Sequence, residues 1–481
     1  MASSTVDSVH SHVSTPAIPV KGQYLGVLTL TMMTAALFFT LRNMPMMAAT
    51  GLQMVFFNLV TVFAFLIPIA LVAAELATAW PKNGVFHWVE EAYGTSWGFT
   101  AIWLQWTQSI FGIASILAYV AVNLSYAFAP HLATNKWFIF TIILGVYWGA
   151  TAANLRGTRA SGMISTICLS SGVLFPSAVL IVMAIIYLIH GYPIRLNLAL
   201  TPDNWLPLMN PEHHLLLFLS FIFGVAGIEV SAGHAREVKN VRRNYPIAVF
   251  SAALLGFVIT LLGGLAIAVV VPVIHLNMVS GSIQALQRLF EAWNLGFLLP
   301  VAAFLIALGA AGQVSTWILG PIKGMWAASQ SGVLPAAFQE ANQHGVPRNL
   351  LLLQALLMSL VSLLILVIPV VTAFLLLTSL SVVLYCFMYL ILFTAAIRLR
   401  YTQPDIPRPY RVPGGNNWGL WLVAGIGFMT SFACLLIGLI PPGHMSEVIY
   451  GPSMLVALLI MVLIPFGMYR FRQKQTATQM D

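Results

Sequence analysis

The sequence predicts an all-α integral membrane protein with twelve transmembrane helices. Of its 481 residues, 59% are hydrophobic and 7% are charged, whereas a soluble domain carries about 25% charged residues. Apolar stretches of about 20 residues, the length that crosses a bilayer as a helix, recur along the chain. Positive charges are concentrated in alternate connections between these stretches. A surface with so few charges requires the lipid bilayer as its main solvent.

Each apolar stretch is expected to be helical, because backbone surrounded by lipid must satisfy its own hydrogen bonds. Residues 1–20 lack a basic start followed by an apolar core, so they are interpreted as a disordered cytoplasmic tail and not as a cleaved signal peptide. Residues 472–481 are expected to form a second short cytoplasmic tail. The predicted spans are approximately 24–49, 54–79, 97–128, 136–154, 163–190, 212–234, 245–273, 297–330, 349–369, 371–397, 418–440 and 448–470.

Lys and Arg residues indicate the orientation, because cytoplasmic loops are enriched in them. With the N-terminus inside, sixteen of the 21 Lys and Arg residues fall on the inner side and only Lys136, Arg195 and Arg288 fall on the outer side. Both termini are therefore predicted to be cytoplasmic. Two residues remain: Arg42 lies inside the first span, and Lys323 lies near the inner end of the eighth, where it can reach the interface. This topology accounts for the net charge of +8, so nucleic acid is not an expected partner.

The motifs of soluble catalysis are missing from the sequence. There is no Walker loop, no His-Glu-x-x-His and no Gly-x-Ser-x-Gly placed after a strand. The three cysteines, Cys168, Cys386 and Cys434, lie in apolar runs without the spacing of a metal site or a disulfide framework. We therefore expect no enzymatic activity, no cofactor and no metal. Transport would have to be driven by gradients rather than by ATP hydrolysis.

The first and sixth spans both contain helix-weakening residues in mid-membrane together with a charge. The first carries Arg42 shortly before Pro45, and the sixth carries Glu229 among several glycines. Spans five apart correspond in two inverted five-helix repeats, here predicted over 21–195 and 196–400, with two further spans in 401–471. Discontinuous helices at corresponding positions are typical of the central site of a transporter.

The chemistry of a broken helix suits an amino acid. Free N–H groups at the start of its second half favour a carboxylate, and free carbonyls at the end of its first half favour an ammonium group. With the first break near Thr34–Ala36, the site is predicted between the first and sixth spans, and spans three, eight and ten complete its walls. The candidate substrate-binding residues are Thr34, Ala35, Ala36, Leu37, Gly224, Gly227, Ile228, Glu229 and Trp317.

Three ionisable residues are candidates for a gate or a pH sensor. A carboxylate within the membrane is costly unless it is paired, hydrated or protonated. Glu229 is thus either a proton-sensitive group or the structural partner of a donor such as Arg42. Arg42 would either attract an acidic substrate or lock an outer gate to a carboxylate. His234, one turn beyond Glu229, is a further candidate because histidine titrates near neutral pH.

Local motifs resemble those of the amino acid–polyamine–organocation (APC) transporter superfamily. They include the segment from Glu75 to Phe99, with Trp80-Pro81-Lys82-Asn83-Gly84 at its centre, and the segments 227–246 and 404–415. The segments 315–325, 334–338 and 342–347 are more closely similar to the bacterial glutamate/GABA antiporters. The resemblance implies a LeuT-like fold, alternating access and exchange of amino acids across the bacterial inner membrane.

Two departures from the antiporters affect what the resemblance implies. Arg42 stands where the family has a tyrosine, which changes the charge of the site. The chain also ends about 11 residues after the last predicted span, too short for a C-terminal plug to reach a central pore. Proton-coupled amino acid uptake through Glu229, polyamine exchange and a non-transporting nutrient sensor stay as alternatives. The sequence does not indicate which amino acids are exchanged, the coupling ion or the oligomeric state.

Overall fold

The computed structural model describes residues 26–81, 84–157, 166–207, 211–415, 417–441 and 447–478. The regular elements in these ranges are all helices. Twelve of the described helical segments are long and apolar enough to cross a membrane, which confirms the predicted fold class. They are Val27–Ala48, Gln53–Ala79, Thr95–Phe128, Lys136–Asn154, Thr166–Ile189, Leu215–Ala232, Val241–Val270, Gly296–Gln330, Arg348–Val367, Val370–Thr402, Trp418–Ile437 and Ile449–Lys474.

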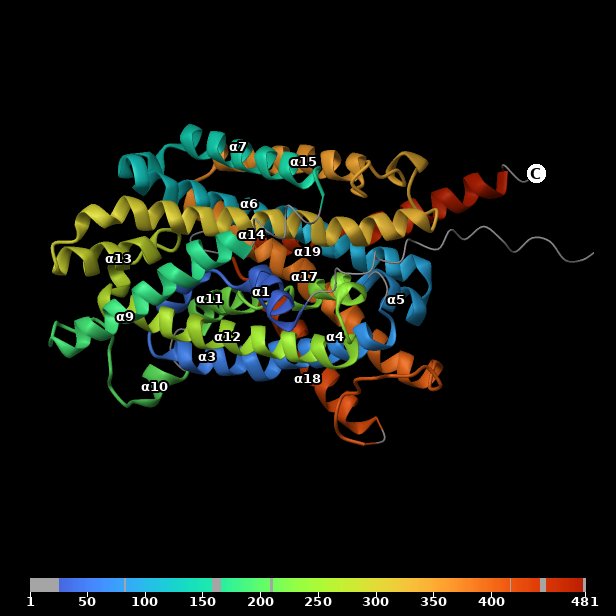
Figure 1. Cartoon of the computed structure of the whole chain (residues 1–481), viewed down its shortest axis with the longest axis horizontal. Helices are drawn as coiled ribbons and strands as arrows, with labels where there is room; N and C mark the ends of the chain where they lie inside the picture. Colours follow the sequence, from blue (N-terminus) through green and yellow to red (C-terminus); the bar gives the residue numbers. More distant parts are fainter. Residues whose placement is uncertain are drawn as a thin grey trace, which may run out of the picture.

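The long helices lie side by side along the longest axis of the molecule (Figure 1). Three of them form its centre, with α6 (Thr95–Phe128) packed along both α14 (Leu299–Gln330) and α17 (Val370–Thr402). On one face, α7 (Lys136–Asn154) packs beside α15 (Arg348–Ser362). The helices α3 (Gln53–Thr61), α12 (Val241–Val270) and α18 (Trp418–Ile437) lie toward the opposite face.

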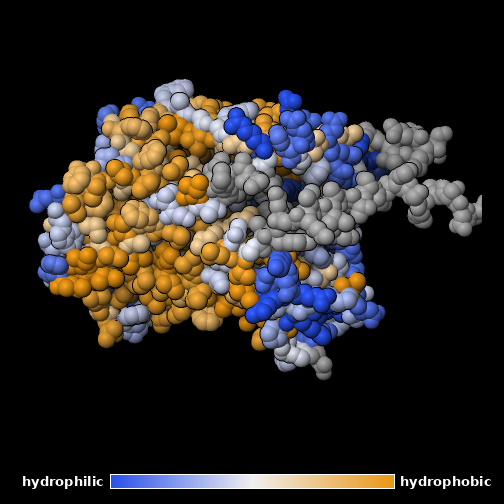
Figure 2. All heavy atoms as spheres, in the orientation of Figure 1, coloured by the Kyte–Doolittle hydropathy of each residue, from blue (hydrophilic) through white to orange (hydrophobic). Residues whose placement is uncertain are grey.

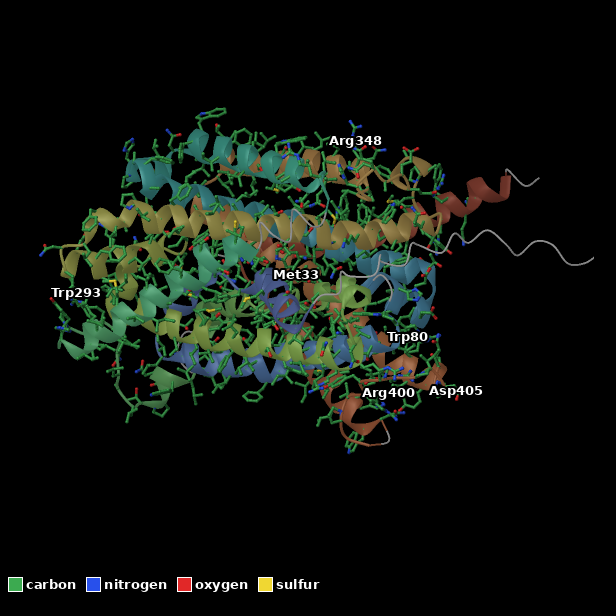
Figure 3. All side chains as sticks on the ribbon, viewed as in Figure 1. Met33, Trp80, Trp293, Arg348, Arg400 and Asp405 are labelled. Atoms are coloured by element: carbon green, nitrogen blue, oxygen red, sulfur yellow. The ribbon has the colours of Figure 1, made fainter. Side chains whose placement is uncertain are left out.

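Two short helices mark the two ends of the bundle. The helix α5 (Val85–Tyr93) joins the second and third spans at one end, and α13 (Gly281–Ala292) joins the seventh and eighth at the other. We call these the α5 end and the α13 end. Trp293 lies at the α13 end, whereas Trp80, Arg400 and Asp405 lie together at the α5 end (Figure 3).

The surface of the bundle has the distribution that a bilayer requires. Apolar side chains cover the middle of the molecule, and hydrophilic ones gather at the ends, most densely at the α5 end (Figure 2). The last helix, α19, runs from Glu447 to Thr478, so most of the predicted tail at 472–481 continues the helix of the twelfth span. A helix can continue past the end of a span because it satisfies its own backbone whether lipid or water surrounds it.

Both predicted helix breaks are present. In the first span, α1 (Val27–Phe38) ends, Phe39 and Thr40 are extended, and a short 3-10 turn and α2 (Met44–Ala48) follow. In the sixth span, α11 (Pro211–Phe223) ends and a turn through Gly227 leads into the 3-10 helix η5 (Ile228–Glu237). Gly227 has φ +105°, a conformation that residues with a Cβ rarely adopt.

The first break lies farther along the chain than the sequence suggested. Residues 34–36 are helical, and the extended residues are Phe39 and Thr40. The Thr40 side chain accepts a hydrogen bond from the main-chain N–H of Arg42 (3.2 Å) and so caps the helix that restarts there. The division of the chain into two inverted repeats stays a prediction.

A buried ion-pair network ties the second span to the tenth at the α5 end. The carboxylate of Glu75, on α4 (Ile67–Ala79), accepts from Arg400 Nε (2.8 Å) and Nη2 (2.6 Å). It also accepts from the main-chain N–H of Val412 (2.7 Å), and Arg408 Nε lies 3.5 Å away. Glu75 is therefore a structural anchor for the connection between the tenth and eleventh spans.

The fifth and eighth spans approach each other closely enough for their backbones to touch. A Cβ added to Gly172 would lie 2.3 Å from the main-chain nitrogen of Gly309, and one added to Gly309 would lie 2.5 Å from the carbonyl carbon of Gly172. Only two glycines allow this contact, which is the small-residue packing common between membrane helices.

Candidate functional site

A small cavity lies in mid-bundle where the two broken helices face the third, eighth and tenth spans. Its free volume, about 10 Å³, is close to the space that one water molecule needs. The five spans that surround it are those expected from the sequence. The lining residues are Leu37, Phe38, Thr40, Arg42, Asn43, Ile116, Phe223, Ala226, Gln313, Trp317 and Tyr385.

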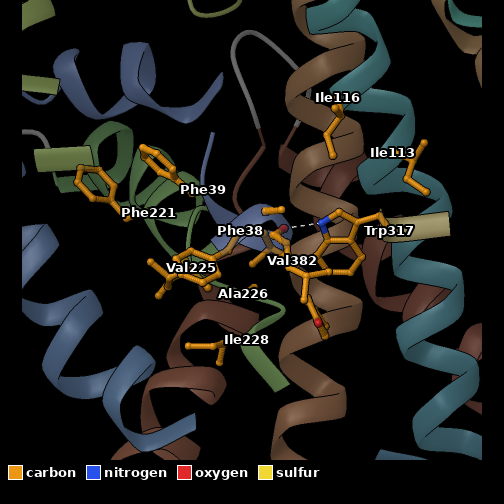
Figure 4. Packing of buried hydrophobic residues seen from close by; sticks show 14 of the residues in the cluster. Phe38, Phe39, Ile113, Ile116, Phe221, Val225, Ala226, Ile228, Trp317 and Val382 are labelled. Carbon is orange, nitrogen blue, oxygen red and sulfur yellow. Dashed lines mark hydrogen bonds between the residues drawn. The ribbon is translucent and has the colours of Figure 1, made fainter. Parts of the chain in front are cut away.

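The carbonyl of Leu37 is the main-chain group that meets the eighth span. Carbonyls in the last turn of a helix have no partner within that helix. Leu37 O accepts instead from Trp317 Nε1 (2.5 Å) and from Gln313 Nε2 (3.2 Å). The first of these bonds is the dashed line from Trp317 in Figure 4. These side chains thus cap the first half-helix at the edge of the cavity.

Gly227 leaves room for the Trp317 indole. A Cβ at Gly227 would lie 2.6 Å from the Trp317 ring, so the sixth span contacts this ring through bare backbone. Figure 4 shows Trp317 directed from the eighth span toward Phe38 of the first and Ala226 of the sixth. The positive φ and the close contact both require glycine at this position.

Glu229 is fully buried and is held by three donors. Its Oε1 accepts from Gln105 Nε2 (2.9 Å) and from Tyr385 OH (2.5 Å), and its Oε2 accepts from Tyr389 OH (2.6 Å). The Tyr389 hydroxyl also accepts from the N–H of Gly227 (3.0 Å). These bonds replace the hydration that a carboxylate loses on burial, and they explain how it is tolerated within the membrane. Arg42 is not its partner.

A larger vestibule of about 140 Å³ leads from the α5 end to Glu229. Glu229 lines this vestibule and Tyr385 lines the central cavity, so the hydrogen bond between them lies in the layer that separates the two spaces. Lys323, expected to extend to the interface, lines the vestibule as well. The full lining is Gly84, Val85, Ile102, Gln105, Glu229, Val230, Gly320, Lys323, Gly324, Trp326 and Gly345.

Arg42 is completely buried on the opposite side of the cavity from Glu229. Its Nη1 donates to Ser115 Oγ (2.6 Å) and, more weakly, to Thr378 Oγ1 (3.5 Å). Its guanidinium carbon lies 4.3 Å from the centre of the Phe223 ring, a cation–π contact. Among the described residues, Arg42 forms no ion pair, and its Nε and Nη2 have no hydrogen-bond partner.

The candidate residues from the sequence fall into four groups. Leu37, Arg42 and Trp317 line the central cavity, and Glu229 lines the vestibule. The side chain of His234 lies outside those that the structure describes. The others are buried around the two breaks without lining either space: Thr34, Ala35, Ala36, Gly224, Gly227 and Ile228.

Several polar residues of the site were not identified from the sequence. Tyr385 and Tyr389 lie one turn apart on α17 and therefore share a face, a spacing that is visible in the chain. Asn43, Gln105 and Gln313 are single amides within apolar helices. Polar side chains within membrane spans usually face the bundle interior, which is the signal that would have found them. No cluster of His, Cys, Asp or Glu suited to a metal occurs among the described residues.

In the described part of the chain, twelve spans and two broken helices that meet at a buried cavity define a membrane transporter. Residues 25–464 match the amino acid permease family, so the chain belongs to that family. It is a multi-pass membrane protein that transports small molecules of the amino acid type, and it is not an enzyme.

Individual relatives match most of the chain. A Legionella pneumophila protein described as an uncharacterized transporter is 37% identical over 95% of this chain and 98% of its own. The glutamate/gamma-aminobutyrate antiporter of Lactococcus lactis is 33% identical over 92% of this chain and 90% of its own. A probable agmatine/putrescine antiporter of the same species is 24% identical over 77% of this chain and 78% of its own.

Proposed function

We propose that this protein is an antiporter that exchanges amino acids across the bacterial inner membrane by alternating access. The observation that carries the proposal is the meeting of two main-chain breaks at one cavity. The helical segments that start at Leu41 and Ile228 begin with N–H groups that favour a carboxylate. The C-terminal end of α1 borders the cavity at Leu37 and Phe38, and its helix dipole favours an ammonium group there. The relatives named as antiporters support exchange.

The α5 end is assigned to the cytoplasm. Basic residues gather on the connections at this end, and cytoplasmic loops are enriched in such residues. Both termini are then cytoplasmic, and the vestibule that reaches Glu229 opens inward. Movement of the first and sixth spans against the third, eighth and tenth would close this vestibule and open the site to the other side. The substrate must bind the two arrangements differently to bias them.

Counterflow in proteoliposomes tests the exchange. Vesicles are loaded with one amino acid at a time, and entry of labelled glutamate, gamma-aminobutyrate and neutral amino acids is followed at acidic and at neutral pH. An antiporter shows fast entry only when a counter-substrate is inside. Equal entry into vesicles without internal amino acid would overturn exchange.

Proton-coupled uptake is the second candidate, and the position of Glu229 favours it. This carboxylate lies in the layer between vestibule and cavity, where a proton carrier would have to lie. The test is uptake into empty vesicles driven by an imposed pH gradient, with Glu229→Gln as the variant. The exposed Glu291→Gln serves as the control. Unchanged flux and unchanged pH dependence in Glu229→Gln would remove this carboxylate from the mechanism.

A further inference from the structure

Arg42 is a buried cation without a compensating anion. Only two carboxylates are buried among the described residues, Glu75 and Glu229, and both are held by other groups. An uncompensated charge within a membrane protein is costly, and such charges mark substrate or ion pathways. Arg42 also borders the central cavity. The missing anion is therefore expected to come from outside the chain.

The two unpartnered nitrogens of Arg42 form one binding edge. Nε and Nη2 lie along one edge of the planar guanidinium, where their N–H groups can bind both oxygens of one carboxylate. Arg400 shows this arrangement in the same protein, because its Nε and Nη2 donate to the two oxygens of Glu75 at 2.8 and 2.6 Å. In Arg42 the equivalent edge is intact and unused, whereas its Nη1 is fixed by the Ser115 hydroxyl.

The surroundings of Arg42 hold the guanidinium in place without neutralising it. Its contacts there are hydroxyl groups and the rings of Phe223 and Phe374, whose centres lie 4.3 and 5.4 Å from the guanidinium carbon. Buried neighbours at the cavity also leave polar atoms without partners, including Gln313 Oε1 and both polar atoms of Asn43. The cavity wall thus offers an anchored cation beside donors and acceptors that a polar ligand would satisfy.

Arg42 and Glu229 are separated along the third span. Arg42 contacts Ser115 and Glu229 contacts Gln105, and these ten residues of α6 correspond to about 15 Å of helix. The central cavity, where the breaks meet, is bordered by Arg42 and by Tyr385, a donor to Glu229. A ligand whose α-carboxylate and ammonium occupy the breaks can therefore direct its side chain toward either charge.

We infer that Arg42 binds a carboxylate on the substrate side chain, so the site selects amino acids with a second carboxylate. Neutral amino acids, ω-amino acids with a single carboxylate, and polyamines cannot supply one carboxylate to the breaks and another to Arg42, so they would bind less tightly. The inference rests on the proposed function and names its substrate class. Lysine could supply the charge at this position but not the planar pair of donors.

Ligand-induced thermal stabilisation of the purified protein tests the inference directly. The probe pair is L-glutamate and L-glutamine, which differ in one carboxylate, and sodium chloride tests whether a simple anion suffices. The variants are Arg42→Met and Arg42→Lys, with Arg288→Met as control because Arg288 lies on α13, away from the cavity. Stabilisation by a ligand reports its affinity for the folded protein.

The wild type and the control are expected to bind glutamate at least about tenfold more tightly than glutamine, a difference of about 1.4 kcal/mol. Arg42→Met should abolish this preference, and Arg42→Lys should keep a small part of it. Without ligand, Arg42→Met should melt at or above the wild-type temperature, because an apolar side chain replaces an unpaired buried charge. That result also shows that the variant folds.

The inference would be overturned by no binding of glutamate, by equal binding of glutamine, or by a preference that survives in Arg42→Met. Stabilisation by chloride equal to that by glutamate would also contradict it. The test separates the two proposals. Exchange of neutral amino acids without an Arg42-dependent preference would retain the antiporter and remove this inference. Arg42-dependent glutamate binding without any flux would do the reverse.

Discussion

The Glu75–Arg400 pair predicts a large and specific loss of stability when it is broken. Both side chains are almost fully buried, with 4% and 3% of their side-chain surface exposed, and two hydrogen bonds of 2.8 and 2.6 Å join them. Removing one partner leaves the other charge buried, which costs about 3–5 kcal/mol. Glu75→Leu should therefore destabilise the protein by about this amount. The double variant Glu75→Leu/Arg400→Leu should lose much less than the two single changes combined.

Thermal unfolding in detergent measures this loss. An unfolding entropy of about 2.1 cal/mol/K per residue, the average for soluble proteins, gives about 1 kcal/mol/K for 481 residues. A loss of 3–5 kcal/mol then lowers the melting temperature by about 3–5 °C. Arg408→Leu is the comparison, because its nitrogen lies farther from Glu75, at 3.5 Å. Single changes that simply add in the double variant would refute a coupled buried pair.

Three further changes have outcomes that the packing specifies. Gly227→Ala would place its methyl 2.6 Å from the Trp317 ring and would impose φ +105° on an alanine, so counterflow should fall at least about tenfold. Gly145→Ala is the control and should leave counterflow unchanged, because the added carbon meets nothing within 4 Å. Gly309→Val would drive a branched side chain into the backbone of the fifth span, and folded protein should be lost on size-exclusion chromatography. Gln354→Leu would leave the buried Trp106 indole and Tyr147 phenol without the amide that now bonds both, at 2.8 and 3.0 Å. Thermal unfolding should show a destabilisation of about 1–3 kcal/mol for each group.

Each of these predictions has a contrary result. Wild-type exchange in Gly227→Ala would mean that the sixth span adapts to a side chain beside Trp317. A monodisperse, folded Gly309→Val would show that the two spans separate without cost. An unchanged melting temperature for Gln354→Leu would show that other groups satisfy the freed donor and acceptor.

The spans and the existence of both breaks could be predicted because their signals are local. Twenty apolar residues suffice to mark a span, and glycines around a charge mark a weak point in a helix. The position of the first break could not be predicted in this way. Phe39 and Thr40 are not helix breakers, and their extended conformation depends on the capping bond that Thr40 accepts from the Arg42 N–H and on the neighbouring helices.

Side-chain partnerships were harder to predict because they depend on how the helices rotate and pack. The sequence left open whether Arg42 pairs with Glu229, and the structure places them on opposite sides of a cavity with separate partners. The donors to Glu229 come from spans far from it in the chain, so no spacing in the sequence connects them. Burial and charge were predictable one residue at a time, whereas the pairing was not.

The glycine contact between the fifth and eighth spans restricts how this sequence can evolve. Neither Gly172 nor Gly309 accommodates a Cβ, and a change at one cannot be compensated by shrinking the other, since both side chains are already absent. Substitution at either site requires the two helices to move apart along their length. We therefore expect homologues with the same helix spacing to keep both glycines, and those that lose one to lose the close approach itself.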